Sequence, residues 1–200
     1  MRQLIAIVDY GVGNVRSVER ALQHVGAEPV LTADPDELER ARGIVLPGVG
    51  AFAPALTKLN EHALGGHLVD LARRGKPLLG ICLGYQLLFD ESMERGRHQG
   101  LGLLPGLVAQ VTTSLRLPVI GWCRVTQTVD SPLWHGIADG SYFYFVHAYT
   151  PDDSGHAVGT SEHSAAAAAV SQNVMGTQFH PEKSGPNGLR IYENFIGLCA

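Results

Sequence analysis

The sequence has no excess of basic residues. Its 200 residues include 15 Lys and Arg against 19 Asp and Glu, which gives a formal net charge of −4 at pH 7. Proteins that bind nucleic acid through its phosphates carry a basic surface. The composition therefore argues against a nucleic-acid partner.

Long hydrophobic runs are also absent. No stretch reaches the roughly 20 consecutive apolar residues that a helix needs to cross a bilayer. The opening segment, residues 1–5, lacks the apolar core of a signal peptide. We therefore expect a cytoplasmic protein that does not associate with membranes.

Cysteine is scarce and unpaired. Cys82, Cys123 and Cys199 are an odd number in separate contexts, without a C-x-x-C pair, so we expect free thiols. Nine histidines are present, but His62 and His67 lack H-E-x-x-H spacing and the others are scattered. The sequence predicts neither a metal site nor a cofactor.

What the sequence does contain is the composition of a globular protein. Hydrophobic residues make up 45% of the chain and charged residues 17%, which fits neither a disordered nor a fibrous protein. A chain of this length can bury one sizeable core without splitting. We expect a single domain over residues 1–200.

The first half alternates between two hydrophobic patterns. Short, continuous apolar runs are typical of strands buried on both faces, and spacings of three and four residues are typical of helices. The strand-like runs are 4–8, 29–31, 43–46 and 77–82, and the helical patterns are 15–25, 53–74 with a break near Gly65 and Gly66, and 85–89. This alternation predicts an α/β fold with a doubly wound, largely parallel central sheet flanked by helices.

After about residue 100 the chain consists of short strand-like pieces such as 142–146 and 174–179, followed by a helical pattern over 188–198. Ala165–Ala169 would favour a helix by propensity alone. Because it is short and lies between strand-like pieces, we predict a strand. The second half is expected to add antiparallel strands to the core.

The strongest local motif is G-x-C-x-G around Cys82. Gly80 and Gly84 flank it at a strand end before a helix, which is the nucleophile-elbow pattern with cysteine in place of serine. The helix N-terminus would favour a thiolate, and the amide of Leu83 would point at an oxyanion. A structural cysteine between two packing glycines is the alternative interpretation.

A cysteine nucleophile needs a base, and the segment 178–182 supplies one. His180 follows a strand, and Glu182 stands two residues later, on the same side if the backbone is extended. Pro181 would stiffen the link. The segment could also be an ordinary surface turn, but together with Cys82 it predicts a Cys-His-Glu triad.

Two glycine-containing loops follow strands. In residues 47–52, Gly48 and Gly50 could bring backbone amides close to a ligand and supply a second oxyanion donor, although an ordinary turn is equally compatible. Residues 9–14 resemble a dinucleotide-binding loop only in part, because Arg16 replaces the third glycine of G-x-G-x-x-G. The sequence therefore argues against dinucleotide binding.

Together these motifs resemble the class I, or triad-type, glutamine amidotransferases. Within that class, the sequence is similar to the glutamine amidotransferase subunits of imidazole glycerol phosphate synthase. The segments that carry this resemblance are 7–14, 46–52, 80–89 and 178–185, and the likeness runs nearly end to end.

The resemblance implies that glutamine is hydrolysed to glutamate and ammonia at Cys82, His180 and Glu182. The oxyanion hole would be formed by Leu83, Val49 and Gly50, and it would be incomplete until the partner's substrate binds. The residues implied in glutamine binding are Gly48, Gly50, Gln86, His147, Ala148 and Tyr149.

The resemblance also implies a heterodimer with a (βα)₈ cyclase. That subunit would use the ammonia to make imidazole glycerol phosphate and aminoimidazole carboxamide ribonucleotide in histidine biosynthesis. Asn14, Trp122 and Lys183 would face the partner. The family usually has P-H-x-G-W-N where this chain has Val119 and Cys123 in place of the histidine and asparagine, which places partner contacts in question more than glutamine chemistry.

Three alternative functions share parts of this pattern. Another glutaminase of the same class, such as those of anthranilate or pyridoxal phosphate synthesis, would have the same triad and a different partner. A cysteine peptidase or hydrolase on a flavodoxin-like sheet would act on a peptide or ester. A non-catalytic interaction subunit would have an inert Cys82.

Overall fold

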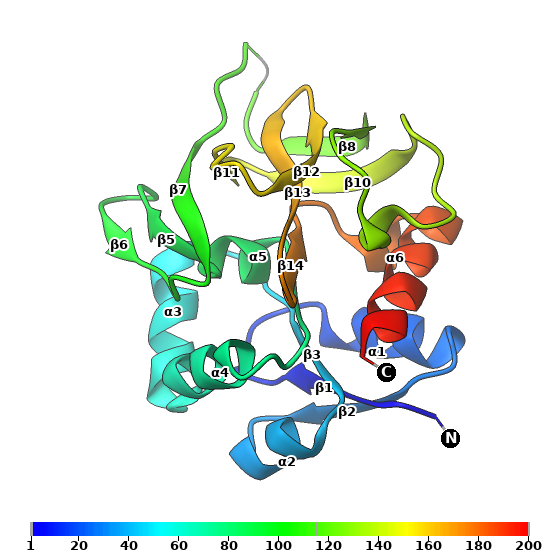
Figure 1. Ribbon diagram of the computed structural model, residues 1–200. Coiled ribbons are helices and arrows are strands. Elements are labelled where there is room, and N and C mark those ends of the chain that lie inside the picture. Colours follow the sequence, from blue (N-terminus) through cyan, green and yellow to red (C-terminus); the bar gives the residue numbers. More distant parts are fainter. Residues whose placement is uncertain (1, 115, 200) are drawn as a thin grey trace.

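The computed structural model describes residues 2–114 and 116–199. Its centre is an eight-stranded sheet with the order β2-β1-β3-β4-β14-β13-β12-β9, and helices cover both faces (Figure 1). The strands of this sheet are β1 (Leu4–Val8), β2 (Glu28–Thr32), β3 (Gly43–Leu46), β4 (Leu78–Ile81), β9 (Thr126–Gln127), β12 (Ala157–Ser161), β13 (Ser164–Ser171) and β14 (Val174–Thr177).

The sheet is mixed in the predicted way. The five strands from β2 to β14 are parallel neighbours, and β13, β12 and β9 continue the sheet in antiparallel pairs. Strands β3, β4 and β14 are buried along their whole length, which explains their continuous apolar runs. The predicted fold class is confirmed.

Helices form a layer on each face of the sheet, so that the sheet separates two hydrophobic clusters. Figure 1 shows α1 and α6 on one face and α3, α4 and α5 on the other. The helices are α1 (Val15–His24), α2 (Pro35–Arg40), α3 (Phe52–Glu61), α4 (Leu64–Arg73), α5 (Leu83–Leu87) and α6 (Gly185–Leu198), with short 3-10 helices η1 (Pro132–Trp134) and η2 (Pro181–Lys183).

Two smaller sheets lie beside the central one. The first pairs β8 with β10, and the second has the order β11-β7-β5-β6. Their strands are β5 (Phe89–Ser92), β6 (His98–Gln99), β7 (Leu104–Gln110), β8 (Val119–Arg124), β10 (Tyr142–His147) and β11 (Tyr149–Pro151).

The structure corrects two predicted boundaries and supports one difficult assignment. The break between α3 and α4 falls at Ala63, whose left-handed φ of 53° turns the chain, and not at Gly65 and Gly66, which are helical. Phe89 begins β5 instead of ending a helix. The alanine-rich segment is strand β13, because residues 166–169 are buried in the sheet and tertiary packing overrides helix propensity.

Three adjacent parallel strands place the candidate residues together. Strands β3, β4 and β14 are neighbours, and their carboxyl ends lie at the same edge of the sheet. The loop beginning at Pro47, the elbow at Cys82 and the segment leading to His180 all leave from this edge. In open α/β sheets, ligands bind at this edge.

Candidate active site

Cys82 occupies a tight turn between β4 and α5. Its backbone angles, φ 53° and ψ −109°, are unfavourable for a residue with a side chain. A Cβ at Gly80 would lie 2.7 Å from Cα of Tyr85, and one at Gly84 would overlap the carbonyl oxygen of Leu46. Both glycines are therefore required by close backbone packing, as a nucleophile elbow demands.

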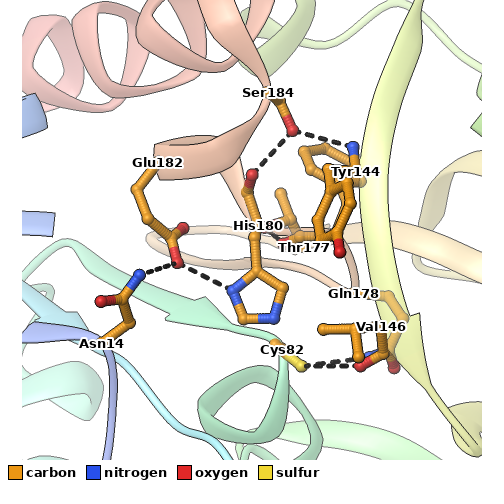
Figure 2. Close-up of polar contacts among 10 residues, drawn as sticks. Asn14, Cys82, Tyr144, Val146, Thr177, Gln178, His180, Glu182 and Ser184 are labelled. Carbon is orange, nitrogen blue, oxygen red and sulfur yellow. Dashed lines mark hydrogen bonds and ion pairs between the residues drawn. The ribbon is translucent and has the colours of Figure 1, made fainter. Parts of the chain in front are cut away.

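His180 is held by backbone contacts on both sides. Its N–H donates to the carbonyl of Tyr144 at 2.9 Å, and its carbonyl accepts from the hydroxyl of Ser184 at 2.7 Å. The same hydroxyl accepts from the N–H of Tyr144 at 3.0 Å (Figure 2). This network fixes the imidazole relative to β10.

Glu182 contacts His180 as expected, but through a different backbone shape. The Nδ1 of His180 and the Oε1 of Glu182 are 2.8 Å apart. The segment is not extended: Pro181–Lys183 forms the 3-10 helix η2, with His180 as its N-cap residue. Proline at the first position of this turn favours the helical φ, so the turn folds the carboxylate back onto the ring.

This pair is almost completely removed from solvent. The side chains of His180 and Glu182 are 2% and 1% exposed. Burial lowers the pKa of His180, but interactions with Cys82 and Glu182 outweigh burial and raise the pKa above its ordinary value. The Nε2 atom makes no hydrogen bond in residues 2–114 and 116–199, and Figure 2 shows the ring between Glu182 and Cys82. The Nε2 atom is therefore free to exchange a proton with the thiol of Cys82.

The sulfur of Cys82 has two further polar neighbours. The Nε2 of Gln178 and the carbonyl oxygen of Val146 each lie 3.8 Å from it. A sulfur accepts weak hydrogen bonds at such distances. Gln178 therefore helps to orient the thiol. The sequence motif did not indicate this role, although Gln178 lies only two residues before His180.

A cavity of about 270 Å³ opens over Cys82. It is lined by Val49, Gly50, Cys82, Leu83, Gln86, Glu94, Pro118, Val146, His147, Ala148, Tyr149 and His180. Of the residues implied in glutamine binding, Gly48 does not line it, because this residue is buried against the backbone of Leu83 and Gly84. The others surround one space.

Gln86 and His147 brace the wall of the cavity. The Nε2 of Gln86 donates to the carbonyl of Tyr149 at 2.8 Å and to the Oε1 of Gln178 at 3.0 Å. The Nδ1 of His147 lies 3.0 Å from the same Tyr149 carbonyl, so this nitrogen must carry the proton. Burial lowers the pKa of His147 to about 4. The ring is therefore neutral at neutral pH.

Glu94 is a cavity residue that the sequence did not suggest. Its Oε2 accepts from the N–H of Phe52 at 2.8 Å, at the start of α3, while the side chain also lines the cavity. It lies 12 residues after the elbow and belongs to no motif. Only the packing of the loop after β5 against α3 brings it there.

The three residues expected to face a partner lie in different settings. The Nδ2 of Asn14 lies 3.4 Å from the Oε1 of Glu182, so Asn14 touches the buried pair (Figure 2). Trp122 is 55% exposed and packs edge-on against Tyr144. The Nζ of Lys183 lies 5.7 Å from the centre of the Tyr144 ring. Trp122 and Lys183 thus share one aromatic neighbour.

The sequence matches a known protein family over nearly its whole length. The model of the family described as "Glutamine amidotransferase class-I" matches residues 6–198. The chain belongs to the class-I glutamine amidotransferases. Curated relatives include "Imidazole glycerol phosphate synthase subunit HisH" of Bacillus cereus, 46% identical over 98% of this chain and 95% of the relative. The protein of the same name from Gloeobacter violaceus is 47% identical over 98% of this chain and 90% of the relative.

Solved structures of other proteins share the fold of this chain. A crystal structure of a glutamine amidotransferase has a TM-score of 0.79 at 19% identity and covers 97% of this chain and 98% of that one. PurLQS from Thermotoga maritima has a TM-score of 0.77 at 23% identity and covers 98% and 99%. These likenesses concern the fold alone.

The described residues form neither a metal site nor a membrane-spanning helix. Within the described residues, no group of three or more His, Cys, Asp or Glu side chains is arranged to hold a metal ion. None of the helices in that part of the chain is long and apolar enough to span a membrane. All three cysteines are free thiols.

Proposed function

We propose that this chain hydrolyses glutamine through Cys82, His180 and Glu182 and delivers the ammonia to a cyclase subunit. The observation that carries the proposal is the buried His180–Glu182 pair next to Cys82, which lines the cavity. A nucleophile, a base and an orienting carboxylate in this order are what acyl transfer requires.

The reaction proceeds through a thioester. His180 takes the proton of the Cys82 thiol, and the sulfur attacks the side-chain amide carbon of glutamine. The carbon–nitrogen bond breaks as His180 returns the proton to the nitrogen, which leaves as ammonia. His180 then takes a proton from water, whose oxygen attacks the thioester carbon. The carbon–sulfur bond breaks, glutamate is released, and His180 returns the proton to the sulfur of Cys82. The raised pKa of His180 makes the ring a stronger base toward the thiol, and it keeps the proton on the ring until the leaving nitrogen takes it.

The negative oxygen of the tetrahedral intermediate needs hydrogen-bond donors. The N–H of Leu83, at the start of α5, would supply one, and the Val49–Gly50 segment would supply the other. Both segments line the cavity. A turn of one peptide in this loop would bring its N–H toward the substrate carbonyl.

Substrate binding would also use Glu94. Its carboxylate lines the cavity, so we assign it to the ammonium group of glutamine. Gln86, His147, Ala148 and Tyr149 would shape the wall that contacts the substrate backbone. Gly48 would act indirectly, by letting the loop pack against the elbow.

For the partner, the proposal follows the relatives. They are named as subunits of imidazole glycerol phosphate synthase, so this chain would pair with the (βα)₈ cyclase of histidine biosynthesis. Trp122 and Lys183 lie on the exposed side of the β8–β10 sheet and η2 and would contact that subunit. Val119 and Cys123 are buried, at 6% each, so these departures from the family pattern alter the packing beneath that surface.

We further propose that the chain acts in the cytoplasm as one domain over residues 1–200 without a cofactor. Hydrolysis of glutamine requires only acid–base and nucleophilic groups, which the chain itself supplies.

The test is a glutaminase assay on the wild-type chain and Cys82→Ala, with and without the cyclase and its ribonucleotide ligand. We expect glutamate release to rise when both are added and to vanish in Cys82→Ala. Cys82-dependent activity that ignores the cyclase would redirect the proposal to another amidotransferase partner. Activity on peptides or esters but not on glutamine would favour the hydrolase alternative, and an inert Cys82 would leave a non-catalytic subunit.

A further inference from the structure

The loop that leads to Val49 and Gly50 is tied to the first strand of the protein. The hydroxyl of Tyr10, two residues after β1, donates to the carbonyl oxygen of Pro47 at 2.7 Å. Tyr10 is 1% exposed, so water cannot replace this contact. A buried hydrogen bond of this kind fixes the direction in which the Pro47 carbonyl points.

Other contacts clamp the same end of the loop. A Cβ at Gly13 would lie 3.2 Å from side-chain atoms of Pro47, and one at Gly48 would lie 2.5 Å from the nitrogen of Gly84. The loop is therefore pressed between the segment after β1 and the beginning of α5. Pro47 and Gly48 have little room to move.

The far end of the loop is tied as well, since the N–H of Phe52 donates to Glu94. Val49 and Gly50 lie between the two ties. Val49 is 42% exposed, Gly50 has a φ of +98°, and neither makes a hydrogen bond to another described residue. One unpaired peptide thus separates two anchored segments.

This arrangement has a consequence for the oxyanion hole. We propose that Tyr10 is a positioning residue for glutamine hydrolysis: its hydroxyl holds the Pro47 carbonyl, so that rotation of the loop is confined to the Val49–Gly50 peptide. This inference rests on the proposed function of that loop. Without the anchor, rotation would spread to the Pro47–Gly48 peptide, and fewer molecules would present a donor at the correct place.

The hydroxyl is suited to act as a permanent donor. Burial, and secondarily the charge of Cys82, raise the pKa of Tyr10 far above its ordinary value. It therefore keeps its proton at every pH at which the triad can work. The link between β1 and the loop is not interrupted by titration.

The experiment compares wild type with Tyr10→Phe in the presence of the cyclase and its ligand. Since loss of one oxyanion donor costs roughly 10²- to 10³-fold, we expect loss of its positioning to lower kcat by about tenfold. KM for glutamine should stay within about twofold. Alkylation of Cys82 by iodoacetamide, followed by peptide mass spectrometry, should keep its rate, because this displacement forms no oxyanion.

Tyr85→Phe is the matched control. Its buried hydroxyl also donates to a backbone carbonyl, that of Ala166 at 3.2 Å on β13, so its loss removes a bond of the same kind away from the loop. We expect kcat to stay near wild type. An unchanged kcat in Tyr10→Phe, or equal losses of kcat and alkylation rate in Tyr10→Phe and Tyr85→Phe, would overturn the inference. Absence of Cys82-dependent activity in the wild type would instead refute the proposed function.

Discussion

At the scale of single residues, the site depends on the buried carboxylate of Glu182, which contacts both His180 and Asn14. Oxygen Oε1 of Glu182 contacts both His180 and Asn14, while Oε2 is buried without a hydrogen bond to the described part of the chain. A buried charge is tolerated only when it is paired. The pairing with His180 is therefore the main source of stability for Glu182, and it couples this residue to proton transfer.

Replacing Glu182 by Gln tests this coupling. The negative charge of Glu182 helps to raise the pKa of His180, so its removal lowers that pKa. The imidazolium is then lost at lower pH, and the alkaline limb of the kcat–pH profile should move toward acid. We expect kcat to fall by about 10² to 10⁴, by analogy with the orienting carboxylate of other triads. An unmoved alkaline limb would contradict the assignment.

The lowered pKa of His147 predicts that the folded protein loses stability in acid. Its pKa is lowered to about 4 in the folded protein from an ordinary 6.5, so between these values the unfolded chain binds more protons. Stability is therefore full above pH 6.5 and is lost as the pH falls toward 4. The difference between pH 7 and pH 5 should be about 2 kcal/mol from this residue.

Urea unfolding of wild type and His147→Gln at the two pH values measures that contribution. The variant cannot be protonated, so its loss of stability between pH 7 and pH 5 should be smaller by about 2 kcal/mol. Equal losses in the two proteins would show that the acid sensitivity comes from other groups.

At the scale of elements, two backbones meet where the loop after β3 crosses the start of α5. A side chain at Gly84 would overlap the carbonyl of Leu46, which cannot move without shifting β3. Gly84→Ala should therefore destabilise the fold by about 1–3 kcal/mol and reduce glutaminase activity. Gly66→Ala, in α4 with open space around it, should instead stabilise by about 0.5–1 kcal/mol. Thermal unfolding of both variants checks the contrast.

The buried strands of the central sheet are the elements that the sequence predicted best. Continuous apolar runs identified β1, β3 and β4 because strands buried on both faces leave no other pattern. The relation between His180 and Glu182 was anticipated for the wrong reason, since the connecting turn is η2 and not a strand. Glu94 could not be found, because only tertiary packing carries it to the cavity.

At the scale of the whole molecule, one surface stands out as apolar. The outer face of the β8–β10 sheet exposes Ile120, Trp122 and Tyr142, at 62%, 55% and 56%. A group of exposed apolar side chains on a protein surface is typical of a contact with another protein. This face carries Trp122, one of the residues that we propose to contact the cyclase.

Ile120→Asp should weaken cyclase binding, because a charge would be desolvated in the complex. We expect the Kd to rise at least about tenfold, equivalent to about 1.4 kcal/mol, in a calorimetric titration. Val129→Asp is a suitable control, since Val129 is 54% exposed but lies outside β8 and β10. A similar loss in both variants would argue that the effect is not specific to this face.

The strand order of the central sheet also affects whether the chain aggregates before it binds a partner. One outer strand is β2, which carries Pro29 and Glu28, and the other is β9, which has only two residues. A proline offers no N–H, and a two-residue strand offers too few groups to recruit a neighbour. Newly made chains should therefore resist aggregation through the edges of this sheet even when the cyclase is in short supply.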